Sequence, residues 1–281
     1  IDSFAEFKDD KNIDRVTLMG IIEDVFRNMI IKKYGSDDNF DIIVNPDKGD
    51  LEIWRNRIVV KDDDVEDSNA EIAYTDAIKI EADFEVGEEV SEEVHLVDFG
   101  RRAILSLRQN LISRIQEHDN TDLYNKYKEL VGEIISGEVH HIRNKEVIII
   151  DDMDNEVILP KDQQIRSDFF RKGDTIRGVV KEVQLKGMKP RIILSRTSPK
   201  FLERLFEQEI PEVADGLIIV KRVERIPGEK AKVAVESYDE RIDPVGACVG
   251  MKGSRIHGIV RELGNENIDV INYTSNTSLF I

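Results

Sequence analysis

The first part of the chain begins with apolar residues at the 3.6-residue spacing of an amphipathic helix. They occupy residues 18–30, and Gly35 follows as a C-terminal stop. Three apolar runs typical of strands come next, at residues 40–44, 51–60 and 70–80. A hairpin loop is predicted at 45–49, between the first two runs. A long amphipathic helix is predicted from near Asp98, followed by a shorter helix over 121–131. This pattern predicts an α+β unit with a helical body and no catalytic motif.

Short runs separated by turn residues replace the helical pattern after Gly132. These runs are predicted as strands at residues 132–140, 146–150, 156–159, 174–183 and 191–195. Five short strands within about 65 residues are typical of a small closed barrel of the oligonucleotide-binding (OB) class. An SH3-like barrel would give a similar pattern, and the periodicity alone does not choose between the two.

The last third of the chain predicts a two-layer α+β domain that contains a glycine turn. Ser198 and Pro199 begin a helix, with serine as the cap and proline at the first helical position. Asp243 and Pro244 repeat this start for a short helix, and Ser254 is predicted to cap a second one. Predicted strands lie at residues 216–226, 231–238 and 268–272.

The charge of the chain is concentrated in its first part. The chain holds 57 acidic and 40 basic residues, a formal net charge of −17. Residues 1–130 hold 32 acids and 17 bases (net −15), residues 131–197 are net +1 and residues 198–281 are net −3. Acidity of the whole chain argues against nucleic-acid binding, but the balanced later segments permit a local basic site. The acidic runs at 62–67 and 81–93 are expected to be solvated faces or, alternatively, a patch for a basic partner.

Composition and motifs exclude several classes of protein and of site. With 40% hydrophobic and 35% charged residues, the chain is neither disordered throughout nor a membrane protein. The single cysteine, Cys248, fits a reducing cytoplasm and is interpreted as a small core residue. His140 and His141 would point to opposite faces of a strand, so no metal site is predicted. No nucleotide-binding motif occurs, and we expect no cofactor and no catalytic residue.

The GMKG sequence at residues 250–253 carries the clearest chemistry. Its two glycines allow a second backbone to approach closely, and the helix predicted to start at Ser254 would present unpaired N–H groups. Lys252 and Arg255 add positive charge at the same point. These features suit a clamp on a short run of sugar-phosphate, as in KH domains. A corner between two helices that needs glycine only for its geometry is the alternative.

The predicted barrel offers cations but few aromatic faces. Basic residues that could follow a phosphate backbone are Lys181, Lys186, Lys189, Arg191 and Arg196. Equally, these residues could form a basic face that is exposed to solvent and binds no RNA. Phe169 and Phe170 are interpreted as core or turn packing and not as a platform for bases. Binding by the barrel is therefore expected to be weak and largely electrostatic.

Residues 241–256, RIDPVGACVGMKGSRI, resemble the first KH domain of the NusA family of bacterial transcription factors, which carries a nearly identical DPVGACVGxxGxR run. The order of domains is also similar, as are residues 209–213 and the helix at 99–115. The resemblance implies a polymerase-binding domain at 1–130, an S1-type OB-fold RNA-binding domain at 131–197 and a first KH domain, of type II, at 198–281. Family members continue into a second KH domain, and we expect this chain to stop about where that domain would begin.

The resemblance also implies a function and the residues that perform it. The family regulates transcription elongation by binding RNA polymerase and nascent single-stranded RNA, and it modulates pausing, termination and antitermination. No reaction is catalysed; we expect a cytoplasmic monomer without membrane contact that works beside other elongation or antitermination factors. The KH run of the family maps onto Gly250, Met251, Lys252, Gly253, Ser254 and Arg255. Arg101, Arg102 and Arg108, at the start of the long helix, are expected near the exiting RNA.

The sequence is also compatible with a second class of protein. RNA-binding or RNA-processing proteins associated with an exonuclease or with the ribosome also combine S1 and KH modules, without polymerase contact. A processing enzyme would need a catalytic domain, and no segment of this chain predicts one.

Overall fold

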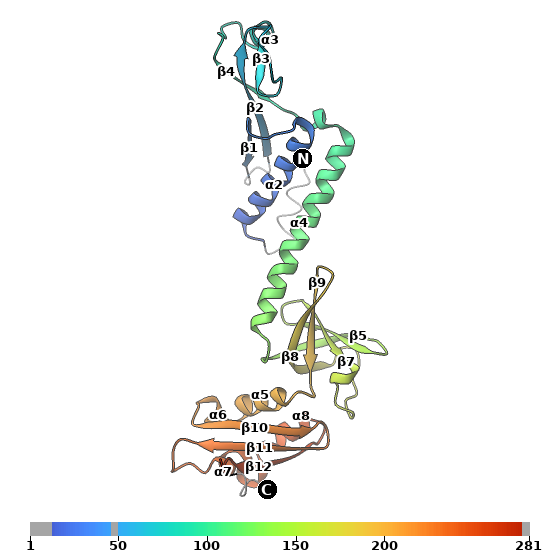
Figure 1. Cartoon of the computed structure of the whole chain (residues 1–281). Coiled ribbons are helices and arrows are strands. Elements are labelled where there is room, and N and C mark those ends of the chain that lie inside the picture. Colours follow the sequence, from blue (N-terminus) through green and yellow to red (C-terminus); the bar gives the residue numbers. More distant parts are fainter. Residues whose placement is uncertain (1–12, 46–49, 277–281) are drawn as a thin grey trace. The chain divides into compact units, whose positions relative to one another are not determined.

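The computed structural model describes residues 13–45 and 50–276, so most of the hairpin loop predicted at 45–49 lies outside the described residues. The fold is mixed α+β, as predicted, and it divides into two compact units, Ile1–Asp119 and Asn120–Ile281 (Figure 1). Each unit has its own apolar core or cores. The limits between domains at 130/131 and 197/198 stay predictions.

The first unit is built on a capped helix and a four-stranded sheet. Its elements are α2 (Arg15–Tyr34), β1 (Phe40–Asn45), β2 (Asp50–Val60), β3 (Glu71–Ala73), α3 (Tyr74–Ile80), β4 (Glu89–Glu93) and the start of α4 (Gly100–Glu129). Asp14 caps α2 by accepting hydrogen bonds from the backbone N–H groups of Val16 and Thr17, both at 3.0 Å. Gly35 ends α2 with a φ of 89°. The apolar stripe of α2 packs with α4, β1 and β2 in one core, which confirms these predicted elements.

Between residues 70 and 131 the structure differs from the predicted elements at three points. The run at 70–80 is a strand for only three residues and then becomes α3. The carboxylate of Asp62 accepts a hydrogen bond from the N–H of Thr75 at 2.9 Å, so the start of α3 is capped from a distant loop. Strand β4 was not predicted, because only Val90 of its five residues is buried and three are glutamates. The shorter helix predicted over 121–131 is the end of α4, which continues to Glu129.

The second unit begins with a closed barrel of five strands. These are β5 (Ile134–Ile142), β6 (Glu146–Asp151), β7 (Glu156–Pro160), β8 (Thr175–Lys186) and β9 (Lys189–Ser195). The barrel closes in the order β5-β6-β7-β9-β8, with β7 and β9 parallel, which is the arrangement of an OB fold and excludes the SH3-like alternative. Alternate side chains fill the interior, as the period of two predicts.

The last turns of α4 belong to the packing of the barrel. Tyr127 is fully buried in the barrel core, and its hydroxyl donates a hydrogen bond to Asp151 at the end of β6. The side-chain amide of Asn155 donates to the same hydroxyl oxygen at 3.1 Å. Burial, together with the carboxylate of Asp151, raises the pKa of Tyr127 and keeps the phenol protonated. The helix end is therefore attached to the barrel by a satisfied polar group inside an apolar core.

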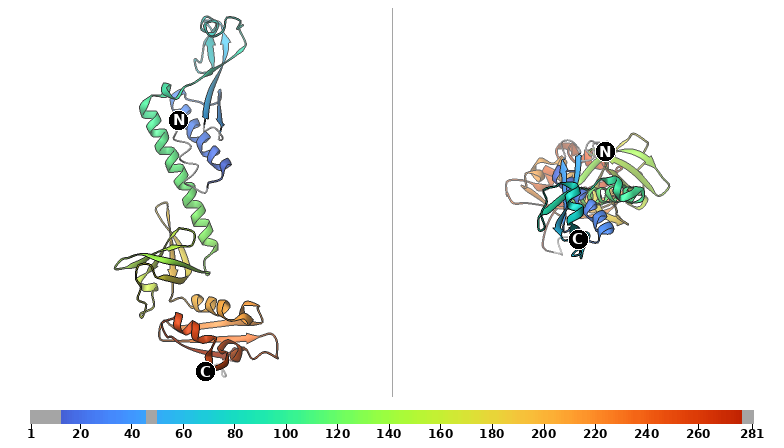
Figure 2. Two further views of the ribbon diagram at one scale, coloured as in Figure 1. Left: turned by 180° about the vertical axis from the view of Figure 1, so that it is seen from behind. Right: turned by 90° about the horizontal axis from the view of Figure 1, so that it is seen from above.

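The second unit continues into a KH domain. Its elements are α5 (Pro199–Glu209), α6 (Pro211–Ala214), β10 (Ile218–Ile226), β11 (Lys230–Ser237), α7 (Pro244–Val249), a 3₁₀ turn at Met251–Gly253, α8 (Ile256–Glu262) and β12 (Asn267–Asn272). The sheet order is β10-β11-β12, with β11 and β12 parallel, and this confirms the predicted type II topology. Helices α5, α7 and α8 share one apolar core with the sheet. Figure 2 shows the helices and strands of this domain from behind and from above.

A fully buried ion pair lies where the barrel meets the KH domain. The guanidinium of Arg225 binds the carboxylate of Glu266 through hydrogen bonds of 3.0 and 2.7 Å, and both side chains are 0% exposed. Arg225 also donates to the backbone carbonyls of Arg196 and Ser198, both at 3.0 Å. One side chain of the KH sheet thus fixes the peptide segment that leaves the barrel.

A second buried arginine reaches the opposite way, from the barrel into the KH domain. Arg196 follows β9 and is only 5% exposed; its Nε lies 2.8 Å from Asp168 and its Nη1 lies 2.7 Å from Glu262 of α8. Burial by itself would lower the pKa of Arg196, but the two carboxylates raise it overall, so the group is charged at any physiological pH. Every hydrogen-bonding direction of this guanidinium is used, because it also donates to the carbonyls of Arg177 in the barrel and Glu262 in the KH domain.

Removal of one member of the buried pair tests whether the joint stabilises the second unit. Arg225→Met leaves the Glu266 carboxylate buried without its partner, and we expect the free energy of unfolding to fall by about 3–5 kcal/mol. The control is Arg222→Met on the same strand, where the side chain is 64% exposed and pairs with an exposed glutamate; there the loss should stay below about 1 kcal/mol. Urea unfolding of the whole chain followed by circular dichroism measures both. Equal losses in the two variants would contradict the role assigned to Arg225.

Candidate nucleic-acid interface

The glycine turn between α7 and α8 depends on three residues with positive φ. Gly250 has a φ of 73° and a ψ of 169°, a conformation almost restricted to glycine. Lys252 and Gly253 follow with φ values of 54° and 77°. A Cβ atom on Gly250 would lie 2.9 Å from side-chain atoms of Ser254 and Arg255, whereas one on Gly253 would meet nothing closer than 3.8 Å. Both glycines have positive φ, but only at Gly250 would a Cβ atom also be crowded; Gly253 leaves open space above the backbone.

The side chains at the tip of the turn face solvent. Met251 is 89% exposed, and Lys252 is exposed with no ion pair to any residue that the structure describes. The backbone and the ammonium group of Lys252 are therefore available to a ligand at the same point. Gly250, Met251, Lys252 and Gly253 all lie in this turn, and their role in binding RNA stays a prediction.

Ser254 and Arg255 have different positions from those predicted. Ser254 does not cap α8; its N–H donates to the carbonyl of Met251 at 3.1 Å, within the turn. The guanidinium of Arg255 turns inward and binds Glu212 of α6 and the carbonyl of Ala247, at 2.7 and 2.8 Å. This contact lowers the pKa of Glu212. Arg255 therefore braces the turn, and the exposed charge at the tip belongs to Lys252.

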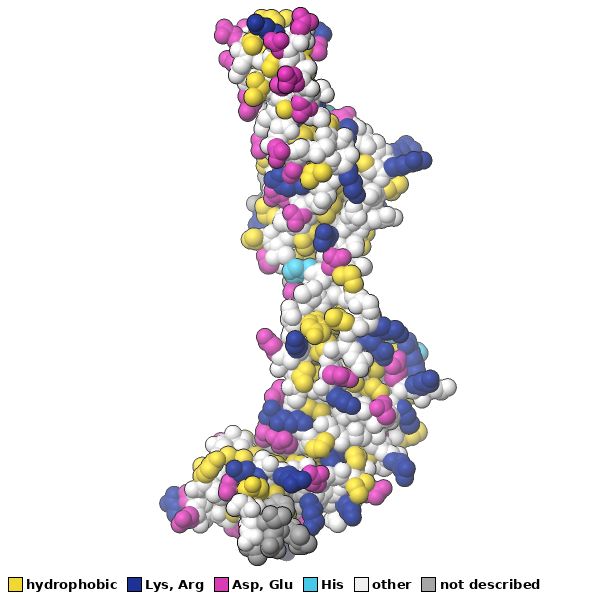
Figure 3. Space-filling model, in the orientation of Figure 1, with side chains coloured by type: hydrophobic (Ala, Val, Ile, Leu, Met, Phe, Trp, Pro, Cys, Tyr) yellow, Lys and Arg dark blue, Asp and Glu magenta, His cyan; other side chains and the backbone are white. Residues whose placement is uncertain are grey.

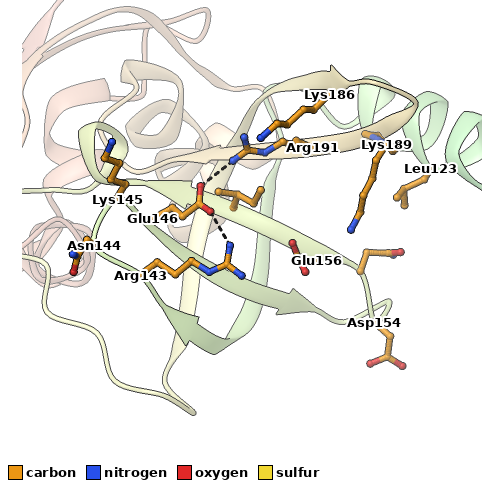
Figure 4. A pocket seen from close by; sticks show the side chains of 13 residues that line it. Leu123, Arg143, Asn144, Lys145, Glu146, Asp154, Glu156, Lys186, Lys189 and Arg191 are labelled. Atoms are coloured by element: carbon orange, nitrogen blue, oxygen red, sulfur yellow. Dashed lines mark hydrogen bonds and ion pairs between the residues drawn. The ribbon is translucent and has the colours of Figure 1, made fainter.

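An open groove of about 810 Å³ lies on one face of the barrel (Figure 4). Its cationic side chains are Arg143, Lys145, Lys186, Lys189 and Arg191. Figure 4 shows Arg143 and Arg191 on either side of Glu146, whose carboxylate lies 3.4 and 2.8 Å from the two guanidinium groups. Glu146 therefore positions these two arginines, while the ammonium groups of the groove stay exposed to solvent.

The groove contains three of the four barrel residues predicted to bind RNA. Lys186, Lys189 and Arg191 line it, at the hairpin between β8 and β9, but Lys181 does not. The prediction missed Arg143 and Lys145, which lie in the turn between β5 and β6. OB folds bind ligands with the loops that follow their first and fourth strands. Arg143 and Lys145 lie in the first of these loops, between two predicted strands, so their position in the sequence was the feature that could have identified them. Arg196, the fifth cation considered for this role, is buried in the joint with the KH domain.

The two phenylalanines of the barrel segment differ in exposure. Phe170 packs against the barrel core, as expected. Phe169 is 77% exposed, so its interpretation as a packing residue is wrong. Cys248 is fully buried in the KH core, and burial raises its pKa to about 11, which agrees with its interpretation as an unreactive core residue.

The first unit presents both signs of charge. Arg101, Arg102 and Arg108 are exposed on α4, and the spacing of seven residues puts the first and last of them two turns apart on one side of the helix. Figure 3 shows acidic side chains over the lobe of β2, β3, α3 and β4, and cationic side chains over the barrel.

The described residues show neither a metal-binding cluster nor a membrane-spanning helix. Among residues 13–45 and 50–276, no three His, Cys, Asp or Glu side chains come together as a metal would require. No helix within the same ranges has the length and apolar character needed to cross a membrane.

An OB barrel joined to a type II KH domain with an exposed GxxG turn defines a class of modular nucleic-acid-binding folds. Comparison with known proteins identifies the family within this class. Residues 1–121 match the NusA N-terminal domain, and residues 196–273 match the NusA-like first KH domain. The chain belongs to the NusA family.

Three curated relatives, each named transcription termination/antitermination protein NusA, illustrate the similarity. The Thermus thermophilus protein is 34% identical over 88% of this chain and 63% of its own length. The Rickettsia prowazekii protein is 34% identical over the whole chain and 55% of its own length. The Bacillus subtilis protein is 31% identical over the whole chain and 75% of its own length. The chain thus spans less than two thirds of the first two relatives.

The geometry of the turn predicts unequal sensitivity of its two glycines. Gly250→Ala should lower the free energy of unfolding by about 1–3 kcal/mol, because alanine is strained in this conformation and its Cβ would crowd Ser254 and Arg255. Gly253→Ala should lose less, since its Cβ has room. Thermal and urea unfolding of both variants measure the difference. A larger loss at Gly253 than at Gly250 would contradict the geometry described.

Proposed function

We propose that this chain is a transcription factor of the termination and antitermination kind, which binds RNA polymerase through its first unit and nascent single-stranded RNA through its second. The printed names of its relatives support this class of function. The observation that carries the RNA part is the exposed GxxG turn of a NusA-like KH domain. The action is binding without catalysis, by a monomer in the cytoplasm, beside other elongation or antitermination factors.

The GxxG turn binds a sugar-phosphate segment by close approach of two backbones. The open space above Gly253 accepts the strand, because no Cβ atom occupies it. The ammonium group of Lys252 supplies one charge-assisted contact to a phosphate. Arg255 acts indirectly, since its ion pair with Glu212 holds the turn in shape.

The barrel groove adds an electrostatic contact. Five cations, three carboxylates and no aromatic side chain line it, so its net positive charge attracts phosphates weakly and with little preference among bases. Affinity for RNA is therefore modest and sensitive to salt, and it depends on attachment of the protein to a larger complex.

The first unit supplies that attachment. Its net charge of −15 over residues 1–130 and its exposed acidic lobe favour a basic protein surface over nucleic acid. Arg101, Arg102 and Arg108 form a separate basic stretch on α4 that suits exiting RNA.

A charge placed at the second glycine tests the clamp. Gly253→Asp should weaken binding of a single-stranded RNA by at least about tenfold, because the carboxylate occupies the space for the strand and repels its phosphates. Fluorescence anisotropy with labelled RNA measures Kd. Asn265→Asp is the matched control: it adds the same charge to the same domain, at an exposed residue that already has a φ of 66°. Similar affinities for the two variants would argue against the clamp.

The groove is tested by the salt dependence of RNA binding. Lys186→Ala and Lys189→Ala should each reduce the slope of log K against log salt by about 0.7, the value for one contact with a single strand. Lys181→Ala is the control, because this exposed lysine on the same strand as Lys186 lies outside the groove. If Lys181→Ala reduces the slope as much as the other two, the cations act as a diffuse surface and not as a groove.

A further inference from the structure

Phe169 is an exposed aromatic residue between two fixed neighbours. It lies in the loop of residues 161–174, between β7 and β8, with 77% of its surface exposed. On one side, the carboxylate of Asp168 is 6% exposed and binds Arg196 at 2.8 Å. On the other side, Phe170 packs into the barrel core, and its ring centroid lies 5.7 Å from the guanidinium of Arg196. The backbone therefore cannot turn Phe169 inward without breaking a buried contact of one of its neighbours.

The loop that carries Phe169 is rich in cations, and one of them contacts its ring. The guanidinium of Arg171 lies 5.6 Å from the centre of its ring, within the range of a cation–π contact. Arg166 and Lys172 are also exposed, and neither has an ion pair with a residue that the structure describes. The three acids of the loop all have partners: Asp168 binds Arg196, Asp174 accepts from the backbone N–H of Arg171 at 2.7 Å, and Asp162 accepts from the side-chain amide of Gln163 at 2.7 Å.

The loop is held in place before any ligand binds. Asp168 accepts a hydrogen bond from the N–H of Ile165 at 2.9 Å, and the N–H of Gly173 donates to the carbonyl of Val139 at 2.9 Å. Ile165 belongs to the core of the KH domain, and a Cβ atom on Gly264 of that domain would lie 2.2 Å from the hydroxyl of Ser167. The loop is thus packed between the barrel and the KH domain, and a ligand that contacts Phe169 loses little affinity to ordering of the protein.

We propose that Phe169, with Arg171 against its ring and Arg166 and Lys172 in the same loop, is a stacking platform for one base of a single-stranded nucleic acid. An aromatic face beside arginine and lysine is the combination that single-strand binders use, with the ring under a base and the cations near the phosphates. A protein hot spot would instead be expected to have further apolar neighbours, and Phe169 is the only exposed large apolar residue of the 161–174 loop. The platform supplies the base contact that the groove lacks. This inference rests on the proposed function, since the ligand is the same RNA.

The test compares variants of the whole chain in titrations with a labelled single-stranded RNA of mixed sequence. An RNA of roughly 20 nucleotides exceeds the ~4–16 nucleotides that one OB fold covers, so it can reach the platform and the glycine turn together. Phe169→Ala should raise Kd at least about fivefold, the lower limit for loss of one stacked base, without change in the salt slope. Phe169→Trp should retain the affinity, whereas Phe169→Leu, which keeps the apolar volume but not the ring, should not. Tyr238→Ala is the control, because this tyrosine of the same unit is 71% exposed.

Gly253→Asp in the same titration separates failure of the platform from failure of the proposed function. If the unmodified chain does not bind the RNA, the proposed function fails and the platform fails with it. If the unmodified chain binds the RNA, and if Gly253→Asp weakens this binding while Phe169→Ala does not, only the platform is overturned. If Phe169→Ala leaves the RNA affinity unchanged but captures less RNA polymerase, Phe169 is assigned to a protein contact. That result would also overturn the proposal.

Discussion

The arrangement of the second unit depends on two buried arginines at the joint between its domains. Arg225 reaches from the KH sheet to the segment after the barrel, and Arg196 reaches from that segment to α8. A buried arginine is tolerated only when carboxylates neutralise it and its hydrogen bonds are satisfied, and Asp168, Glu262 and Glu266 meet this condition. Because a guanidinium fits its partners in one geometry, the pairs specify orientation as well as contact. The joint therefore makes the barrel and the KH domain one body.

This joint gives the three proposed RNA contacts a fixed relation to one another. The barrel groove, the loop of Phe169 and the GxxG turn each offer little by themselves: a few solvated cations, one aromatic ring and one glycine clamp. Contacts within one compact unit that bind the same strand gain in effective concentration, so weak proposed sites of this kind add to a useful affinity. The acidity of the chain does not oppose this, because most of it belongs to residues 1–130.

Much of the fold was predictable because its signals are local, whereas the site depends on contacts between distant parts of the sequence. Alternation, proline-capped helix starts and glycine turns identified the strands of the barrel and most elements of the KH domain. The pattern could not show that Asp62 caps a helix from another loop, so that helix was taken for a strand. Arg255 was predicted to bind RNA, and the sequence could not show that its guanidinium pairs with Glu212, 43 positions away. Likewise, barrel closure alone brings Arg143 near Lys189 in one groove.

The most direct measurement of the central claim is the binding of this chain to stalled transcription elongation complexes, with the nascent RNA either long or trimmed back to the polymerase surface. Two attachments, one to the protein and one to the RNA, predict capture of both complexes, with tighter binding when the RNA is long. Gly253→Asp should reduce binding toward the level of the trimmed complex without abolishing it. A chain that binds free RNA but neither complex, or that binds both equally and without an effect of Gly253→Asp, would contradict the division of roles between the two units.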